Sequence, residues 1–394
     1  MWLTDLQGVI EARPLDGTRG ADFFGPLLPL FFTSVLGASP AALGRMEGLV
    51  ESIASLLKLY SGRLADRLPR RKPLVIIGYS LASITRPALA AAAAPWQVVA
   101  LRVIDRTGKG LRGAPRDALI ADSVDAGIRG RAFGFHRAAD HLGAIAGPLT
   151  ALVLIPVLFG SGPLAAAQYR VLFMIAAVPA LASIGVLAFL VREPLRHEIK
   201  DAPGWGANGL CGSFWYLMAV IVLFTLGNSS DMFLLLRAGN LGLSPQHLYL
   251  IWALLHVVKS ALSTPAGALS DRVPRRWLIA GGWLVYAAVY YGFGRVTTAA
   301  QIWWLFAVYG VYFGMAEGSE KALVADLVPD NLRGTAYGWY NAAVGIAALP
   351  ASWLFGLLWN AFGPATAFEF GATLALVAAA LLLAAGEPMR GISR

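Results

Sequence analysis

Gly-Arg-Leu-Ala-Asp-Arg-Leu-Pro-Arg-Arg, residues 62–71, and Gly-Ala-Leu-Ser-Asp-Arg-Val-Pro-Arg-Arg, residues 267–276, are two versions of one phrase. Each version ends one strongly apolar stretch and precedes another. A basic loop between two apolar spans is typical of the cytoplasmic side of a membrane protein. Its recurrence about half a chain away indicates a membrane protein built from two similar halves.

The composition favours helices that cross a bilayer. The 394 residues are 57% hydrophobic and 14% charged, and their mean hydropathy is +0.62, whereas soluble proteins carry about 25% charged residues. About 20 mostly apolar residues are needed for a helix to cross the hydrocarbon core, and the apolar segments lack the alternating polarity of barrel strands. We therefore predict an all-α membrane protein with twelve transmembrane helices, at about 21–37, 43–62, 73–94, 96–122, 132–158, 169–191, 213–238, 246–269, 277–294, 301–327, 335–358 and 364–385.

The net charge of +9 is distributed by loop. Basic residues gather in alternate loops, and the intervening loops are nearly neutral, which is the positive-inside pattern. It predicts an integral protein of a bacterial-type inner (plasma) membrane, with the basic loops and both termini in the cytoplasm, and it gives no reason to expect nucleic-acid binding. Residues 1–20 are polar and do not resemble a signal peptide. The single Cys211 excludes an intrachain disulfide.

The two halves align by eye at an offset of 204 to 205 residues. Asp66 matches Asp271, and Ala-Leu-Ile-Ala-Asp at 118–122 matches Ala-Leu-Val-Ala-Asp at 322–326. Internal repeats of this kind are common in secondary transporters, whose substrate site lies near the bilayer midplane between the halves. We expect a six-helix bundle at 1–191 with an atypical polar start at 1–20, a cytoplasmic linker at 192–212, and a second six-helix bundle at 213–394.

With these motifs the chain resembles the major facilitator superfamily from about residue 21 to 385. The phrase at 62–71 resembles the family's best-known loop signature, with Pro69 where the family usually has Gly. Arg102 falls at the position of the family's helix 4 arginine. Gly134, Gly143, Gly147 and Pro148 fit in part a helix 5 pattern associated with antiporters, without its terminal Gly pair. The resemblance implies two pseudo-twofold-related six-helix bundles, alternating access, and a central cavity lined by helices 1, 4, 7 and 10.

The repeated phrases also predict a gate. A carboxylate at the end of one helix can pair with a basic side chain or face the positive N-terminus of another helix, so Asp66 and Asp271 can latch the bundles together. The alternative is that these loops only set topology, and that the helix 5 glycines only allow close packing. Equivalent positions of helices 4 and 10 carry opposite charges, which predicts the pairs Arg116–Glu320 and Asp117–Lys321. The predicted gating residues are Asp66, Arg67, Arg71, Asp271, Arg272, Arg276, Arg116, Asp117, Glu320 and Lys321.

Charges inside the spans are costly and mark a transport pathway or pair with one another. The span at 96–122 carries an excess of basic groups, which favours an anionic or zwitterionic substrate. A buried carboxylate can instead carry a proton. An alternative is a self-neutralising salt-bridge network that gates without touching substrate. The substrate-binding candidates are Arg102, Asp105, Arg106, Lys109, Arg112 and Asn228, and the proton-coupling candidates are Asp22, Asp231, Asp140 and Glu317.

Nothing in the sequence predicts an enzyme, a cofactor or a metal. Gly108-Lys109-Gly110 lacks the spacing of a phosphate loop, and no third ligand accompanies His136 and Asp140. We expect a monomeric secondary active transporter that uses protons to export a small polar or anionic solute by antiport. The alternatives are uptake or facilitated transport of an anionic metabolite or metal chelate and, from another class, a lipid flippase.

Overall fold

The computed structural model describes residue 28 and residues 31–37, 40–160, 164–191, 193, 209–243 and 245–385. Every regular element among these residues is a helix, which confirms the predicted all-α fold. The predicted first span, at 21–37, falls mostly outside the described residues, and its described part contains the π-helix η2 (Phe31–Val35).

The first half contains five long helices after η2. Their ends lie close to the predicted ones, because prolines and polar side chains mark them. At the start of one helix, Pro95 needs no N–H partner in the first turn, and the Gln97 side chain accepts the free N–H of Ala93 at 2.7 Å. The helices are α3 (Pro40–Arg67), α4 (Lys72–Ala90), α5 (Pro95–Asp122), α6 (Arg129–Phe159) and α7 (Ala166–Phe189), with the 3₁₀ turn η3 (Ala126–Ile128) before α6.

The second half begins with an interrupted helix, where the sequence predicts one continuous span at 213–238. The first segment ends at Gly227, where a side chain would lie 2.8 Å from the carbonyl oxygen of Gly371. The polar residues 228–231 follow before the second segment begins. The elements are α8 (Gly212–Gly227), α9 (Met232–Asn240), α10 (Pro245–Ser270), α11 (Arg275–Arg295), α12 (Ala299–Asp326), η4 (Asp330–Leu332), α13 (Arg333–Phe362) and α14 (Pro364–Ala384).

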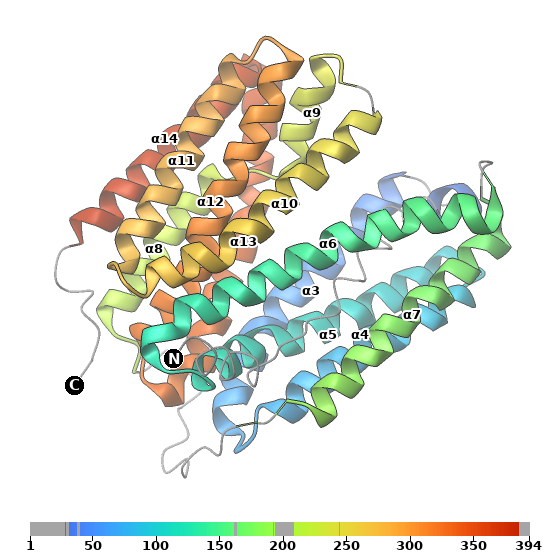
Figure 1. Cartoon of the computed structure of the whole chain (residues 1–394), viewed down its shortest axis with the longest axis horizontal. Coiled ribbons are helices and arrows are strands. Elements are labelled where there is room, and N and C mark those ends of the chain that lie inside the picture. The colour runs from blue at the N-terminus through green and yellow to red at the C-terminus, as the bar shows by residue number, and fades with distance from the viewer. Residues whose placement is uncertain are drawn as a thin grey trace.

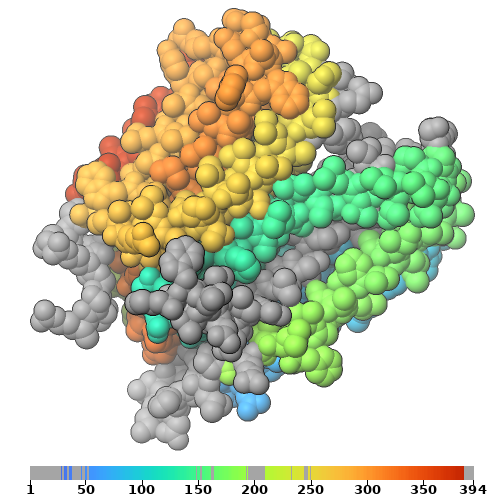
Figure 2. Space-filling model, in the orientation of Figure 1, coloured from blue at the N-terminus to red at the C-terminus, as the bar shows by residue number. Residues whose placement is uncertain are grey.

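The helices form two bundles that meet at one end and diverge toward the other (Figure 1). The contact between them is made mainly by α6 against α10 and by α3 against α13. The meeting end carries the loops around 63–72, 129–131, 272–276 and 333, and we call it the basic end. The space-filling view shows α6 and α10 in contact near the basic end and apart beyond it (Figure 2).

Glycines allow the bundles to approach closely at both crossings. A Cβ atom on Gly62 of α3 would overlap the carbonyl oxygen of Gly334 at the start of α13. A Cβ atom on Gly267 of α10 would overlap the carbonyl oxygen of Gly130 at the start of α6. Small residues allow such backbone contact between membrane helices, and the two crossings are the same contact in the two halves of the repeat.

Five of the described segments are long and apolar enough to span a bilayer by length and composition alone: α4, α7, α12, α13 with η4, and α14. Other segments that the sequence predicts as spans do not meet this standard of length and apolar composition. Seven residues of α5 from Arg102 to Asp117, both included, are charged, and α8 has only 16 residues. Charged side chains in such a helix must face protein or water rather than lipid, which directs attention to the space between the bundles.

Candidate functional site

Asp66 of the first half binds the beginning of a helix in the second half. Its carboxylate accepts the backbone N–H groups of Gly334 at 2.8 Å and Thr335 at 2.5 Å, in the first turn of α13. Arg71 donates to the same carboxylate at 2.7 Å, and both side chains are fully buried. The free N–H groups and positive dipole of a helix N-terminus favour an anion. We call this contact the first latch.

An equivalent contact joins an aspartate of the second half to the beginning of a helix in the first half. Asp271, just after α10, accepts the N–H groups of Gly130 at 2.7 Å and Arg131 at 2.8 Å, in the first turn of α6. Arg275 donates to this carboxylate at 3.2 Å. Arg276, a predicted gating residue, lies one residue further along α11. We call this contact the second latch.

Two aspartates at helix ends extend the latches, and the sequence analysis did not assign them a role. Asp122, the last residue of α5, pairs with Arg333 at 2.6 Å and contacts Arg71. Asp326, the last residue of α12, pairs with Arg129 at 3.1 Å and with Arg275 at 2.8 Å. The aspartates and the pair Arg129 and Arg333 recur at equivalent positions of the repeat, whereas Arg71 aligns with Arg276 rather than Arg275. The repeat therefore contained most of this signal.

Further from the basic end than the latches, α5 and α12 are joined by a buried ion pair. Lys321 Nζ donates to Asp117 Oδ2 at 2.5 Å, and both side chains are at most 2% exposed. The sequence predicts this pair. The second predicted pair, Arg116–Glu320, has different partners in the structure: Arg116 donates to Asp117 at 3.1 Å, and Glu320 accepts bonds from Trp283 and Tyr340.

Still further from the basic end, a series of ionisable side chains in contact with one another crosses the boundary between the bundles. His141 Nε2 of α6 lies 3.2 Å from Glu317 Oε2 of α12, and His141 Nδ1 lies 3.3 Å from His256 Nδ1 of α10. Arg137 lies 3.8 Å from Glu317 and donates to Asp140 at 3.2 Å. We call these five residues the boundary network. His141 lies about 18 Å along α6, so the network lies near the middle of the predicted membrane thickness.

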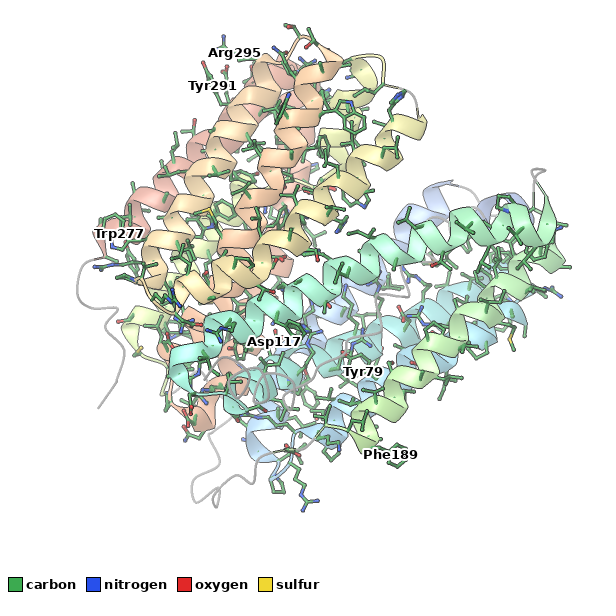
Figure 3. All side chains as sticks on the ribbon, viewed as in Figure 1. Tyr79, Asp117, Phe189, Trp277, Tyr291 and Arg295 are labelled. Carbon is green, nitrogen blue, oxygen red and sulfur yellow. The ribbon has the colours of Figure 1, made fainter. Side chains whose placement is uncertain are left out.

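The predicted substrate residues of α5 turn partly toward their own bundle. Asp105 pairs with Arg102 at 3.4 Å and lies 4.0 Å from Arg86 of α4. The Arg112 guanidinium stacks over the Tyr79 ring of α4, with 4.1 Å to its centroid. Figure 3 labels Tyr79 within the first bundle and Asp117 close to the second. Arg106 and Lys109 of α5 are half-buried.

The interruption between α8 and α9 faces a cluster of tyrosines. Tyr309 of α12 donates to Asp231 at 2.7 Å. The hydroxyl of Tyr286, from α11, donates to the carbonyl oxygen of Gly227 at 2.9 Å and lies 3.4 Å from Asn228 Oδ1. These bonds satisfy backbone and side-chain groups that the end of α8 leaves free. The same tyrosine cluster therefore contacts both Asn228, a predicted substrate-binding residue, and Asp231, a predicted proton-coupling residue. The two lie in one polar site of the second bundle.

The remaining predicted residues are more scattered. Asp22 lies outside the described residues, and so does the side chain of Pro148. Arg67 ends α3 and is half-buried, as is Arg276, whereas Arg272 is exposed. Gly134 packs against Ser263 of α10, while Gly143 is half-buried and Gly147 buried. In the part of the chain that the structure describes, no three His, Cys, Asp or Glu side chains gather as a metal site would require.

Comparison with known proteins agrees with this architecture. The family model of the Major Facilitator Superfamily matches residues 20–258 and 217–392. An uncharacterized MFS-type transporter of Methanocaldococcus jannaschii is 32% identical over 364 residues, which cover 91% of this chain and 89% of that protein. The multidrug resistance protein MdtH of Cronobacter sakazakii is 24% identical, over 84% of this chain and 81% of its own.

A solved structure shares the fold at low identity. The crystal structure of the human organic anion transporter MFSD10 has a TM-score of 0.75 and 15% sequence identity, over 95% of this chain and 98% of that one. The two bundles, their symmetric latches and the family match define a helical membrane transporter. The chain belongs to the major facilitator superfamily, and it shares the superfamily's twelve-helix fold.

Proposed function

We propose that the protein is a proton-coupled exporter of small polar or anionic solutes, working as a monomer in an inner or plasma membrane. The basic end faces the cytoplasm under the positive-inside rule. The conformation described above, closed at the basic end, is then outward-facing. The proposed domains follow the two bundles, 1–191 and 213–394, joined by a linker at 192–212.

Proton coupling is supported chiefly by the boundary network. His141 and Glu317 belong to different bundles and lie 3.2 Å apart, and the His141–His256 contact also crosses the boundary. Alternating access breaks and re-forms contacts at this boundary, so the protonation state of these groups changes the relative free energy of the two conformations. Imidazole is the side chain that ordinarily changes charge between pH 5 and 8.

A polar or anionic substrate is supported by the charge of α5. Arg102, Arg106, Lys109 and Arg112 lie within eleven residues that contain one carboxylate, Asp105. Arginine clusters hold carboxylates and other oxyanions well. Asn228 of the second bundle is the proposed polar contact on the opposite side.

Export is supported by two weaker observations. The relatives named as multidrug resistance proteins match over most of this chain. The helix 5 pattern Gly134, Gly143, Gly147 and Pro148 resembles that of antiporters in part. Together they favour antiport over the alternatives of uptake and facilitated passage.

The test is proton movement in proteoliposomes. Purified protein is challenged with organic anions, zwitterions and cationic drugs while a pH-sensitive dye reports the lumen. Wild type is compared with Glu317→Gln, with Asp231→Asn and with the control Glu369→Gln. Glu369 is a half-buried residue of α14 that pairs with Arg295.

We expect substrate-driven proton movement against the substrate flux in wild type and in the control, and its loss in Glu317→Gln. Loss in Asp231→Asn as well would assign a second coupling residue to the tyrosine site. Substrate flux without proton movement in any variant would refute coupled export and leave facilitated transport. Transfer of a labelled lipid between leaflets, without flux of any soluble probe, would favour a flippase.

A further inference from the structure

Glu320 is a buried acid of α12 that the boundary network does not use. It lies on α12 one turn beyond Glu317, and it is 8% exposed. Its Oε1 atom accepts the indole N–H of Trp283 at 3.1 Å, and its Oε2 atom accepts the hydroxyl of Tyr340 at 2.8 Å. Both partners are neutral. A buried carboxylate is ordinarily paired with a cation or bound to a metal, because desolvation of its charge is costly.

The charges around Glu320 do not replace a cation partner. Lys321, the next residue on α12, is engaged with Asp117 of α5. The charged groups that act on Glu320 are Glu317 of its own helix and Arg137 of α6, which have opposite signs. The neighbouring helices α11 and α13 contribute the uncharged Trp283 and Tyr340.

The hydrogen-bond partners of Glu320 suit a carboxyl group in either protonation state. An indole N–H only donates, so Trp283 needs an acceptor, which Oε1 provides in both forms. A tyrosine hydroxyl donates or accepts. When a proton binds Oε2, the acid can donate to Tyr340, whose own O–H rotates away. The indole itself is held by stacking on Phe224, with 4.5 Å between ring centroids and 8° between planes.

We infer that Glu320 is a proton-binding site of the transport cycle, which exchanges its proton with the boundary network through Glu317. Residues three apart on a helix are neighbours on one face, so Glu317 links Glu320 to His141. Trp283 and Tyr340 are positioning residues that orient the carboxyl group. The inference rests on the proposed proton coupling and adds a second site behind the boundary.

The experiment is an infrared pH titration of the full-length protein in nanodiscs. Wild type is compared with Glu320→Gln, with Tyr340→Phe and with the control Glu369→Gln, whose residue is half-buried and pairs with Arg295. We expect a carboxylic-acid carbonyl band that appears on acidification in wild type and the control and is missing in Glu320→Gln. In Tyr340→Phe the band should persist at a shifted frequency, because one hydrogen-bond partner of the acid is removed.

A wild-type band that persists unchanged in Glu320→Gln, or the same frequency in Tyr340→Phe, would overturn the assignment. Tyr340→Phe retains the carboxyl group, so the inference stays testable if Glu320→Gln does not fold. Proton movement in proteoliposomes separates this inference from the proposed function. Wild-type coupling that is unaltered in Glu320→Gln removes the site from the cycle and leaves the exporter proposal intact. A titrating Glu320 without substrate-driven proton movement refutes the exporter proposal and, with it, the role of this site in transport.

Discussion

Replacing Asp66 by asparagine removes the charge that holds the beginning of α13 against the first bundle. The carboxylate accepts two backbone N–H groups and one arginine. A hydrogen bond to a charged group contributes about 1.5–3 kcal/mol and a neutral one about 0.5–1.5 kcal/mol. Weakening both backbone bonds by about 1–1.5 kcal/mol each therefore destabilises the closed basic end by about 2–3 kcal/mol. This corresponds to roughly a 30- to 160-fold change in the ratio of closed to open conformers.

Distances between spin labels at the basic end measure this ratio. Labels replace the exposed Arg70 of the first bundle and Asn331 of the second, in a background in which Cys211 is changed to serine. Asp66→Asn should increase the population with long distances. The control is Asp330→Asn, because Asp330 is 80% exposed and its pair with Arg333 is a surface ion pair, worth at most about 1 kcal/mol. A change in Asp66→Asn no larger than in Asp330→Asn would refute the latch.

Three other perturbations test other parts of the interface. Asp117→Asn should destabilise the protein by about 3–5 kcal/mol, because it leaves the buried Lys321 without its carboxylate partner; Lys321→Met should cost less, because Arg116 still donates to Asp117, and thermal unfolding checks both. Gly267→Ala should open the basic end, because its Cβ atom would overlap a backbone carbonyl of α6; a spin-label distance unchanged from wild type would contradict the close crossing. His256→Gln should shift the spin-label distances across the boundary, because it removes the imidazole that lies 3.3 Å from His141; distances unchanged from wild type would contradict a role for this contact in holding the bundles together.

The sequence was sufficient to predict most of the fold. Eleven of the twelve predicted spans correspond to described helices, because apolar length and loop charge are read along the chain without reference to its partners. The interruption after Gly227 was missed. A glycine in an apolar run is tolerated in many helices, so Gly227 alone did not indicate an interruption. Glycine is needed there because the backbone of Gly371, which is distant in sequence, approaches closely.

The candidate site was less predictable, for a physical reason. Repeat spacing predicted the Asp117–Lys321 contact and drew attention to Asp66 and Asp271, since equivalent positions meet across a pseudo-twofold axis. It did not predict the partners of Glu320, because an indole and a phenol from α11 and α13 have no charge to reveal them. The rotation of each helix about its own axis decides such contacts, and polarity alone defines that rotation only coarsely.

The Asp117–Lys321 pair has a consequence for the relation between the halves. A two-fold interface between identical subunits is isologous, so a residue on the axis meets its own copy. Positions 117 and 321 are equivalent in the repeat and touch each other, so they occupy that axis. In a dimer of identical halves this place would hold two carboxylates or two ammonium groups in mutual repulsion. The attraction observed there therefore requires two halves that carry different residues at this place, whereas the two latches would satisfy a symmetric dimer equally well.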